Sequence, residues 1–311
     1  VTGWEGIYDA TQYGHCSYQP RAFYDEEKNE KKYFYYNEFR KGETYRYDED
    51  CLFLNIFAPD TAKEGDKLPV LIYIHGGGFV AGDKHYRRAH SRWLANQGYF
   101  VVNVNYGLCP DYKFPEPLRH LVYALNWVGE NAEKYNLDLD KLVVSGDSAG
   151  GYYATVLACI ATDKALQERL GVSTDLRFNG AVLNCGIYDV AEALSAKIPF
   201  DLGGKILYDV ATISKKEFDS YEYRDICSPI EKVTSDFPKS FIVYAVKDFF
   251  CRGQGERLLK NLADQGVYTE EYHSTAFLSN HCFSLNWKGK DPEKANNLAE
   301  DFLARFKRGE I

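Results

Sequence analysis

Short apolar runs alternate with amphipathic stretches along most of the chain. Runs of β-branched and aromatic residues bounded by turn formers are typical of buried strands, whereas apolar residues repeated every three or four positions are typical of helices. Strands are therefore predicted at 51–57, 69–74, 99–106, 141–144, 178–187, 240–246 and 267–272, and helices at 87–97, 116–135, 152–160, 253–265 and 292–307. This alternation predicts a doubly wound α/β fold, in which a mostly parallel sheet carries helices on both faces.

Two stretches depart from this rhythm. Residues 1–50 are polar and rich in tyrosine, and residues 190–235 contain Gly203-Gly204 and Pro229, which are expected to interrupt regular structure. We predict one main domain at 51–311, with residues 1–50 and 190–235 as two parts of a small lid. A run of aromatic residues at 33–36 either packs the extension onto the domain, which is the commoner arrangement, or lines the mouth of a site.

One stretch changes abruptly from strand-like to helix-like residues. The run ending at Val143 and Val144 is followed by S-G-D-S-A-G-G at 145–151, and an apolar stretch comes next. The pattern G-x-S-x-G between a strand and a helix is the nucleophile elbow, a tight turn that exposes one serine and excludes bulky neighbours. The same pattern occurs in ordinary glycine-rich turns, but the flanking strand and helix favour the elbow, with Ser148 as nucleophile.

A second glycine-rich motif follows an earlier strand. H-G-G-G-F stands at 75–79, directly after the apolar run at 69–74. Consecutive glycines allow backbone N–H groups to turn toward a ligand. Beside an elbow, such a loop is expected to supply the oxyanion hole, with the N–H groups of Gly77, Gly78 and Ala149 as donors. His75 is expected to order the loop through a hydrogen bond, and the alternative for the loop is a flexible hinge.

A serine hydroxyl attacks only if an imidazole takes its proton, and the imidazole needs a carboxylate to hold its tautomer. Asp248 follows the strand at 240–246, and His281 lies in the loop after the strand at 267–272. The chain order serine, acid, histidine is the one in which folds with this elbow supply a triad. We therefore predict Asp248 and His281 as the partners of Ser148.

Other acids and bases of the chain fit these two roles less well. His273 is the competing base, but it stands at the end of a strand, and the loop position of His281 suits a general base better. Glu256 and Asp264 fall on a predicted helix and are expected to be solvated surface charges. Asp189 ends the preceding strand and is the reserve acid. Asp147 is expected to brace the elbow.

Charge and hydropathy narrow the range of partners. The chain has 37 basic and 45 acidic residues, a net charge of −8, and no cluster of lysine and arginine, so we expect no nucleic acid partner. No apolar run approaches about 18 residues, so no membrane span is expected. The first ten residues lack the layout of a signal peptide, although Val1 need not be the native start.

The cysteine spacing does not indicate a metal site or a redox pair. All eight cysteines are scattered, without a C-x-x-C pair, so neither a zinc ribbon nor a redox pair is indicated and no metal is predicted. The simplest interpretation is a reduced, cytoplasmic protein. A disulfide between Cys16 and Cys51, and secretion after removal of a leader, remain open alternatives.

The two glycine motifs together resemble the hormone-sensitive-lipase-like branch of the α/β-hydrolase esterases, whose marks are H-G-G-G and G-D-S-A-G-G. The resemblance runs from about residue 50 to the end of the chain. It departs in two places. The segment E-D-C-L-F-L-N at 49–55 resembles a signature of the larger type-B carboxylesterases, and Phe249-Phe250 follows the predicted acid where this branch often has D-P-L.

The resemblance implies a serine carboxylesterase that acts on small-molecule esters with mostly short acyl chains, or aryl esters, and uses no cofactor. It implies the same triad and oxyanion hole that the motifs predict. An amidase or peptidase with the same triad, and a catalytically silent binding protein on the same fold, are the alternatives. Acyl length, alcohol, natural substrate and oligomeric state, a homodimer included, are left open by the sequence.

Overall fold

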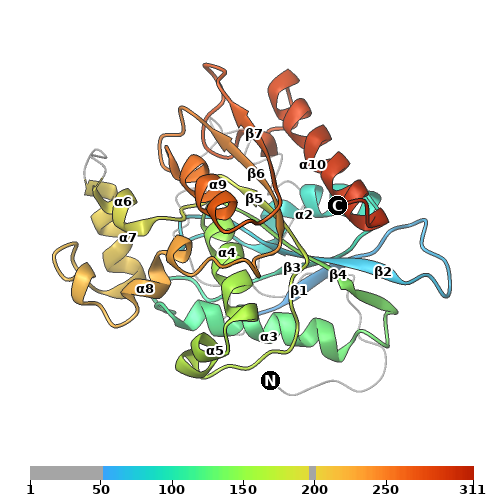
Figure 1. Ribbon diagram of the computed structural model, residues 1–311, viewed down its shortest axis with the longest axis horizontal. Helices are drawn as coiled ribbons and strands as arrows, with labels where there is room; N and C mark the ends of the chain where they lie inside the picture. Colours follow the sequence, from blue (N-terminus) through green and yellow to red (C-terminus); the bar gives the residue numbers. More distant parts are fainter. Residues whose placement is uncertain (1–51, 196–200) are drawn as a thin grey trace, which may run out of the picture.

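The structure, a computed structural model, describes residues 52–195 and 201–311 (Figure 1). Within these residues, seven strands form one open sheet in the order β1-β3-β2-β4-β5-β6-β7. β1 is antiparallel to β3, and all other neighbouring strands are parallel. The strands are β1 (Leu54–Phe57), β2 (Leu68–Ile74), β3 (Phe100–Val104), β4 (Leu137–Asp147), β5 (Gly180–Asn184), β6 (Lys239–Ala245) and β7 (Thr269–Ser274).

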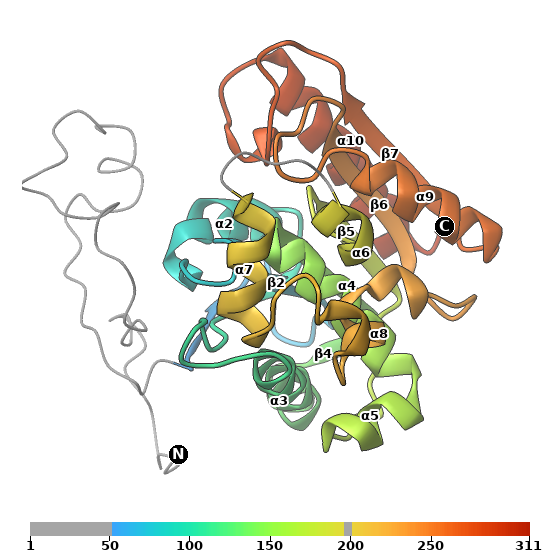
Figure 2. The same ribbon diagram turned by 90° about the vertical axis from the view of Figure 1, so that its left-hand side faces the viewer.

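Helices cover both faces of this sheet, which confirms the predicted architecture (Figure 1, Figure 2). One face carries α3 (Glu116–Glu130), α4 (Ala149–Thr162) and α9 (Gln254–Asp264), with α5 (Lys164–Leu170) following α4. The other face carries α2 (Arg88–Asn96) and α10 (Lys290–Arg308). Each face therefore has its own hydrophobic core.

The strands supply side chains to both cores in alternation. In β2, Val70, Ile72 and Ile74 belong to the core beneath α3 and α4, whereas Leu71 and Tyr73 belong to the core beneath α2 and α10. Successive side chains of a strand point to opposite faces, so a strand buried on both sides is apolar throughout. This explains why the central strands appear in the sequence as unbroken apolar runs.

The described residues of 190–235 form three short α-helices, α6 (Val190–Ser195), α7 (Leu202–Ala211) and α8 (Arg224–Cys227), which lie together at the left of Figure 1. This segment lies against the loop after β3, where the N–H of Phe114 donates to the carbonyl of Val210 at 2.9 Å. The expectation that the two glycines at 203–204 interrupt regular structure is wrong, because both lie in the first turn of α7. Glycine weakens a helix by only about 1 kcal/mol.

Two elements differ most from their predicted bounds. The strand predicted at 141–144 extends over all of β4, because its polar first half still pairs with β2 across a register shift between Pro69 and Val70. The helix predicted at 116–135 ends at Glu130. Asn131 closes it, since its backbone N–H and its side-chain amide both donate to the carbonyl of Trp127, at 3.1 and 2.9 Å.

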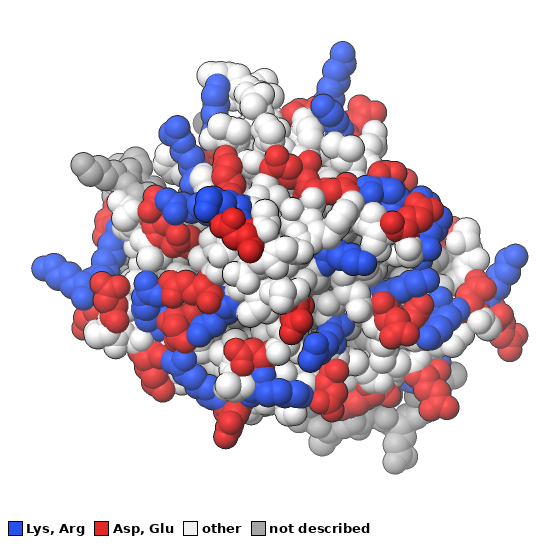
Figure 3. All heavy atoms as spheres, in the orientation of Figure 1, with Lys and Arg blue, Asp and Glu red and all other residues white. Residues whose placement is uncertain are grey.

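Several expectations concern residues 1–51, which lie outside the described residues. They include the N-terminal part of the lid and the disulfide between Cys16 and Cys51. The six cysteines that the structure does describe are free thiols. No helix in the described ranges combines the length and the apolar character needed to cross a bilayer. On the face shown in Figure 3, acidic and basic side chains are interspersed.

One buried histidine on α2 makes folding sensitive to acid. His90 packs against the rings of Tyr73, Trp93 and Trp287, at centroid distances of 5.1, 5.2 and 5.7 Å. Burial lowers the pKa of His90 from 6.5 to about 4, outweighing the opposite effect of Asp147. Below pH 6.5 the unfolded chain therefore takes up a proton that the folded protein does not.

We expect the free energy of unfolding to fall by up to about 3 kcal/mol through His90 as the pH drops from 6.5 to 4, and this contribution to be complete above pH 6.5. Urea unfolding of the His90→Gln variant should lack this part of the pH dependence. His273→Gln, at a half-exposed histidine, is the control. An equal loss of slope in both variants would contradict the assignment to His90.

Candidate active site

The predicted elbow lies where β4 ends and α4 begins. Ser148 stands between them with φ 54° and ψ −120°, a strained conformation for a residue with a side chain. A Cβ atom at Gly146 would lie 2.3 Å from the carbonyl oxygen of Gly150, and one at Gly150 would lie 2.0 Å from that of Ile74. Because real Cβ contacts are never so short, only glycine fits on either side of the serine.

His281 lies in the loop between β7 and a short 3-10 helix, η8 (Phe283–Leu285). Its Nε2 atom is 2.8 Å from the Oγ of Ser148. The end of β5 holds both segments in place through Asn184. The Asn184 carbonyl accepts from the N–H of Ser148 at 2.8 Å, and its side-chain amide donates to the Oγ of Ser284 at 2.6 Å.

Asp248 follows β6 and is 2% exposed. One carboxylate oxygen is 2.9 Å from the Nδ1 of His281, and the other is 3.1 Å from it. The second oxygen also accepts from the backbone N–H groups of Phe250 and Cys251, each at 2.8 Å. The carboxylate is thus held rigidly, and it favours the tautomer of His281 in which Nδ1 carries the proton.

Two further side chains support this pair, and sequence reasoning did not identify their roles. The Oδ1 of Asn280 accepts from the N–H of Phe249 at 2.9 Å and from that of His281 at 2.8 Å, so it joins the acid loop to the histidine loop. The ring of Phe250 meets that of His281 edge to face, with centroids 5.1 Å apart. Phe250, the second residue of the pair that departs from the resembled family, therefore contacts the histidine directly.

The glycine loop turns toward the elbow. Gly77 and Gly78 have φ values of 130° and 62°, and the carbonyl of Gly77 accepts from the N–H of Ala81 at 3.0 Å. Within the described residues, the N–H groups of Gly77, Gly78 and Ala149 donate to no other group. Three backbone donors are therefore free to bind an oxygen atom.

His75 has no contact with the serine among the described interactions and instead holds the glycine loop. Its Nδ1 lies 2.7 Å from the carbonyl oxygen of Gly76, and its ring stacks on that of Tyr106 with centroids 4.5 Å apart. The Tyr106 hydroxyl donates to the carbonyl of His75 at 2.9 Å. Burial lowers the pKa of His75, which favours a neutral ring.

Asp147 joins the glycine loop to the elbow. Its fully buried carboxylate accepts from the Nε and Nη2 of Arg87 at 2.9 and 2.6 Å, from the hydroxyl of Tyr73 at 2.8 Å and from the N–H of Gly76 at 3.2 Å. Burial alone would raise the pKa of Asp147, but the charge and hydrogen bonds of Arg87 lower it to about 2. The expected brace is present, and Arg87 is a partner that the sequence did not indicate.

The competing residues lie elsewhere. His273 is half exposed, with its Nδ1 3.4 Å from a carboxylate oxygen of Glu271. Asp189 faces Arg257 at 3.4 Å. Glu256 and Asp264 are exposed on α9, as expected for surface charges. The geometry thus brings together Ser148, His281 and Asp248 and none of their alternatives.

The BD-FAE family model matches residues 54–262 of this chain. The para-nitrobenzyl esterase of Bacillus subtilis (strain 168) is 34% identical over 178 residues, which are 53% of this chain and 33% of that protein. The arylesterase of Saccharolobus solfataricus is 29% identical over 204 residues, 64% of each protein. A solved structure of an inhibited Esterase B from Lactobacillus rhamnosis has a TM-score of 0.72 and 26% identity, over 83% of this chain and 82% of that one.

The chain spans about a third of the length of several curated relatives that it matches. The family match nevertheless covers most of the described sheet, from β1 into α9. The fold is likewise that of the esterase structures, which confirms the resemblance to the hormone-sensitive-lipase-like α/β-hydrolases. This chain belongs to the BD-FAE family of the α/β-hydrolase fold.

Proposed function

We propose that this protein is a carboxylesterase in which Ser148 is the nucleophile, His281 the general base and Asp248 the acid that orients it. The observation that carries the proposal is the continuous hydrogen-bonded chain from the serine to the carboxylate, with 2.8 Å between Oγ and Nε2 and 2.9 Å between Nδ1 and the carboxylate. The named relatives, a para-nitrobenzyl esterase and an arylesterase, support the same reaction class.

In the first step, the Oγ of Ser148 attacks the carbonyl carbon of the ester while His281 Nε2 takes the hydroxyl proton. The buried carboxylate of Asp248 stabilises the imidazolium that forms. The carbonyl oxygen becomes negative and is bound by the N–H groups of Gly77, Gly78 and Ala149. Because these donors are fixed by the backbone, they need little reorganisation when the charge develops.

In the second step, the carbon–oxygen bond to the alcohol breaks, and the alcohol leaves with the proton from His281. Water then attacks the acyl-serine, His281 takes a proton from this water, and the acid is released as Ser148 regains its proton. The residues of the chain and water account for every proton in this cycle.

The surroundings of His281 support an apolar substrate. Phe249 and Phe250 are 52% and 43% exposed beside the histidine, and Phe277 and Leu278, in the same loop as His281, are 84% and 90% exposed. Such side chains offer apolar surface to a short acyl or aryl group. We further propose that the helices within 190–235, which follow β5, act as a lid over this end of the sheet.

Hydrolysis of p-nitrophenyl esters from acetate to palmitate tests the proposal. Ser148→Ala and His281→Ala should each lower kcat by about 10⁶-fold, and Asp248→Asn by about 10⁴-fold, because the three groups act as a unit. His273→Ala and the surface variant Ser195→Ala should retain activity. The acyl chain length at which turnover falls would indicate the longest acyl group that the site accepts.

Labelling with a fluorophosphonate distinguishes the alternatives, since it reports on Ser148 itself. If the protein is an esterase, the probe should label the wild type and should not label Ser148→Ala. A folded protein that neither hydrolyses any ester nor reacts with the probe would contradict the proposal and favour the silent binding protein. Faster turnover of p-nitroanilides than of the matching esters would instead favour the amidase.

The two loop glycines offer a matched test of the oxyanion hole. A Cβ atom at Gly77 would lie 1.7 Å from the carbonyl oxygen of Ala81, whereas one at Gly78 has nothing within 4 Å. Gly77→Ala should therefore displace the loop and lower kcat by about 10²-fold or more. Gly78→Ala should cost about 1–2 kcal/mol of stability through its positive φ but keep most of kcat. Equal kcat in the two variants would contradict this geometry.

A further inference from the structure

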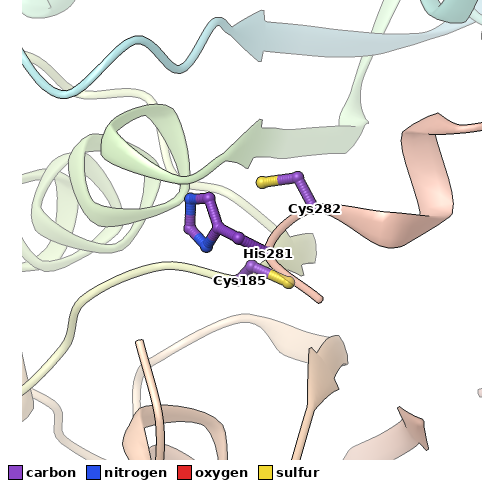
Figure 4. Close-up of side chains that lie close together, drawn as sticks. All are labelled: Cys185, His281 and Cys282. Carbon is purple, nitrogen blue, oxygen red and sulfur yellow. The ribbon is translucent and has the colours of Figure 1, made fainter. Parts of the chain in front are cut away.

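Two thiols lie beside the histidine of the site. Cys185 directly follows β5, and Cys282 directly follows His281 in the chain (Figure 4). Their Sγ atoms and one ring nitrogen of His281 all lie within 4.8 Å of one another. Cys185 is 2% exposed, and Cys282 is half-buried. Neither cysteine has a role in the proposed hydrolysis.

The backbone holds both cysteines rigidly. Their φ values, 48° at Cys185 and 53° at Cys282, lie in the left-handed region, which costs about 1–2 kcal/mol each for residues with a side chain. The N–H of Cys185 donates to the carbonyl of Val243 at 2.8 Å, and the side-chain amide of Asn184 ties the end of β5 to Ser284 at 2.6 Å. The thiols are therefore presented to each other by two joined loops.

Two thiolates and an imidazole are the ligands that Zn²⁺ and related thiophilic cations prefer. We propose that Cys185, Cys282 and His281 form a binding site for a thiophilic divalent cation such as Zn²⁺, and that occupation of this site inhibits the enzyme. The site itself stands on the geometry of the three ligands, and only the inhibition rests on the proposed function. An ion bound to the imidazole takes the lone pair that accepts the Ser148 proton, or displaces the ring from its partners.

The spacing suits such an ion. Zn–S bonds of about 2.3 Å and Zn–N bonds of about 2.0 Å in a tetrahedral site place the ligand atoms about 3.5–3.8 Å apart. From a spacing of at most 4.8 Å, small side-chain rotations bring the three atoms into range. Three protein ligands leave the fourth position to water or to another group.

The charge balance also suits a buried site. The ion binds thiolates, so any proton on the two sulfur atoms passes to solvent, and a divalent cation with two thiolates and a neutral imidazole has no net charge. The site therefore gains no uncompensated charge, which would be costly in a buried place.

A second group of ligands shares the same histidine but is less suitable. Asp248, Cys251 and His281 also have ligand atoms within 4.8 Å of one another. The Asp248 carboxylate already accepts hydrogen bonds from the N–H groups of Phe250 and Cys251 and lies 2.9 Å from the Nδ1 of His281. An ion there would have to replace these bonds, so the pair of thiols is the better set.

Cadmium is a suitable probe, because each Cd–thiolate bond adds a charge-transfer band in the ultraviolet. The full chain carrying Cys16→Ser and Cys51→Ser, titrated under a phosphine reductant, should show the band of two thiolates at one equivalent of Cd²⁺. Cys185→Ser, Cys282→Ser and His281→Gln in this background should each weaken binding at least about tenfold. Cys159→Ser removes another buried free thiol and should change neither binding nor hydrolysis.

Absence of the band in the parent chain, or an unchanged band in both Cys185→Ser and Cys282→Ser, would overturn the site. If a serine variant fails to fold, His281→Gln is the deciding variant. It keeps both thiols but lacks the imidazole, so it should bind Cd²⁺ more weakly than the parent chain does. Zn²⁺ should inhibit ester hydrolysis by the parent chain, a chelator should restore it, and the activity left in Cys282→Ser should resist the ion.

The two proposals fail independently. Ser148→Ala should bind Cd²⁺ as well as the parent chain does although it lacks turnover. A thiolate band in a chain without esterase activity would support the metal site and count against the proposed function. Active enzyme without the band, or with the band but without inhibition by Zn²⁺, would overturn the inhibitory site and leave the esterase proposal intact.

Discussion

The site depends on one buried carboxylate. Asp147 lies between the end of β4 and the glycine loop after β2, and it binds both of them together with Arg87. A buried charge is tolerated only if it is paired and fully hydrogen-bonded, and breaking such a pair costs about 3–5 kcal/mol. The same interaction therefore stabilises the turn that carries Ser148 and sets its distance from the backbone donors of Gly77 and Gly78.

The order of the elements could be predicted because each central strand is buried on both faces and forms a distinct apolar run. That the three candidate site residues lie together could be predicted for a related reason. Parallel strands all deliver their C-terminal loops to one edge of the sheet, so Ser148, Asp248 and His281 meet there although they are far apart in the chain. The two glycine motifs indicated the turns at which backbone atoms of the glycine loop and of the elbow come close to each other.

The features that could not be predicted depend on contacts between distant residues. Nothing in the local pattern around Arg87 indicates that it pairs with Asp147, and the two cysteines beside His281 lie in loops almost a hundred residues apart. The polar first half of β4 is a strand only because β2 pairs with it. The short helices of 190–235 carry weak periodicity, since each contributes only a few side chains to the core.

The close contact between the glycine loop and the elbow has a consequence for protein engineering. Cβ atoms at Gly76, Gly146 and Gly150 would each lie within 2.6 Å of a backbone atom. Substitutions at these three glycines cannot enlarge the site on that side, because there is no side chain to shorten and no space for a larger one. Changes in side-chain size near His281 should therefore be sought at Phe249 and Phe250, which are exposed.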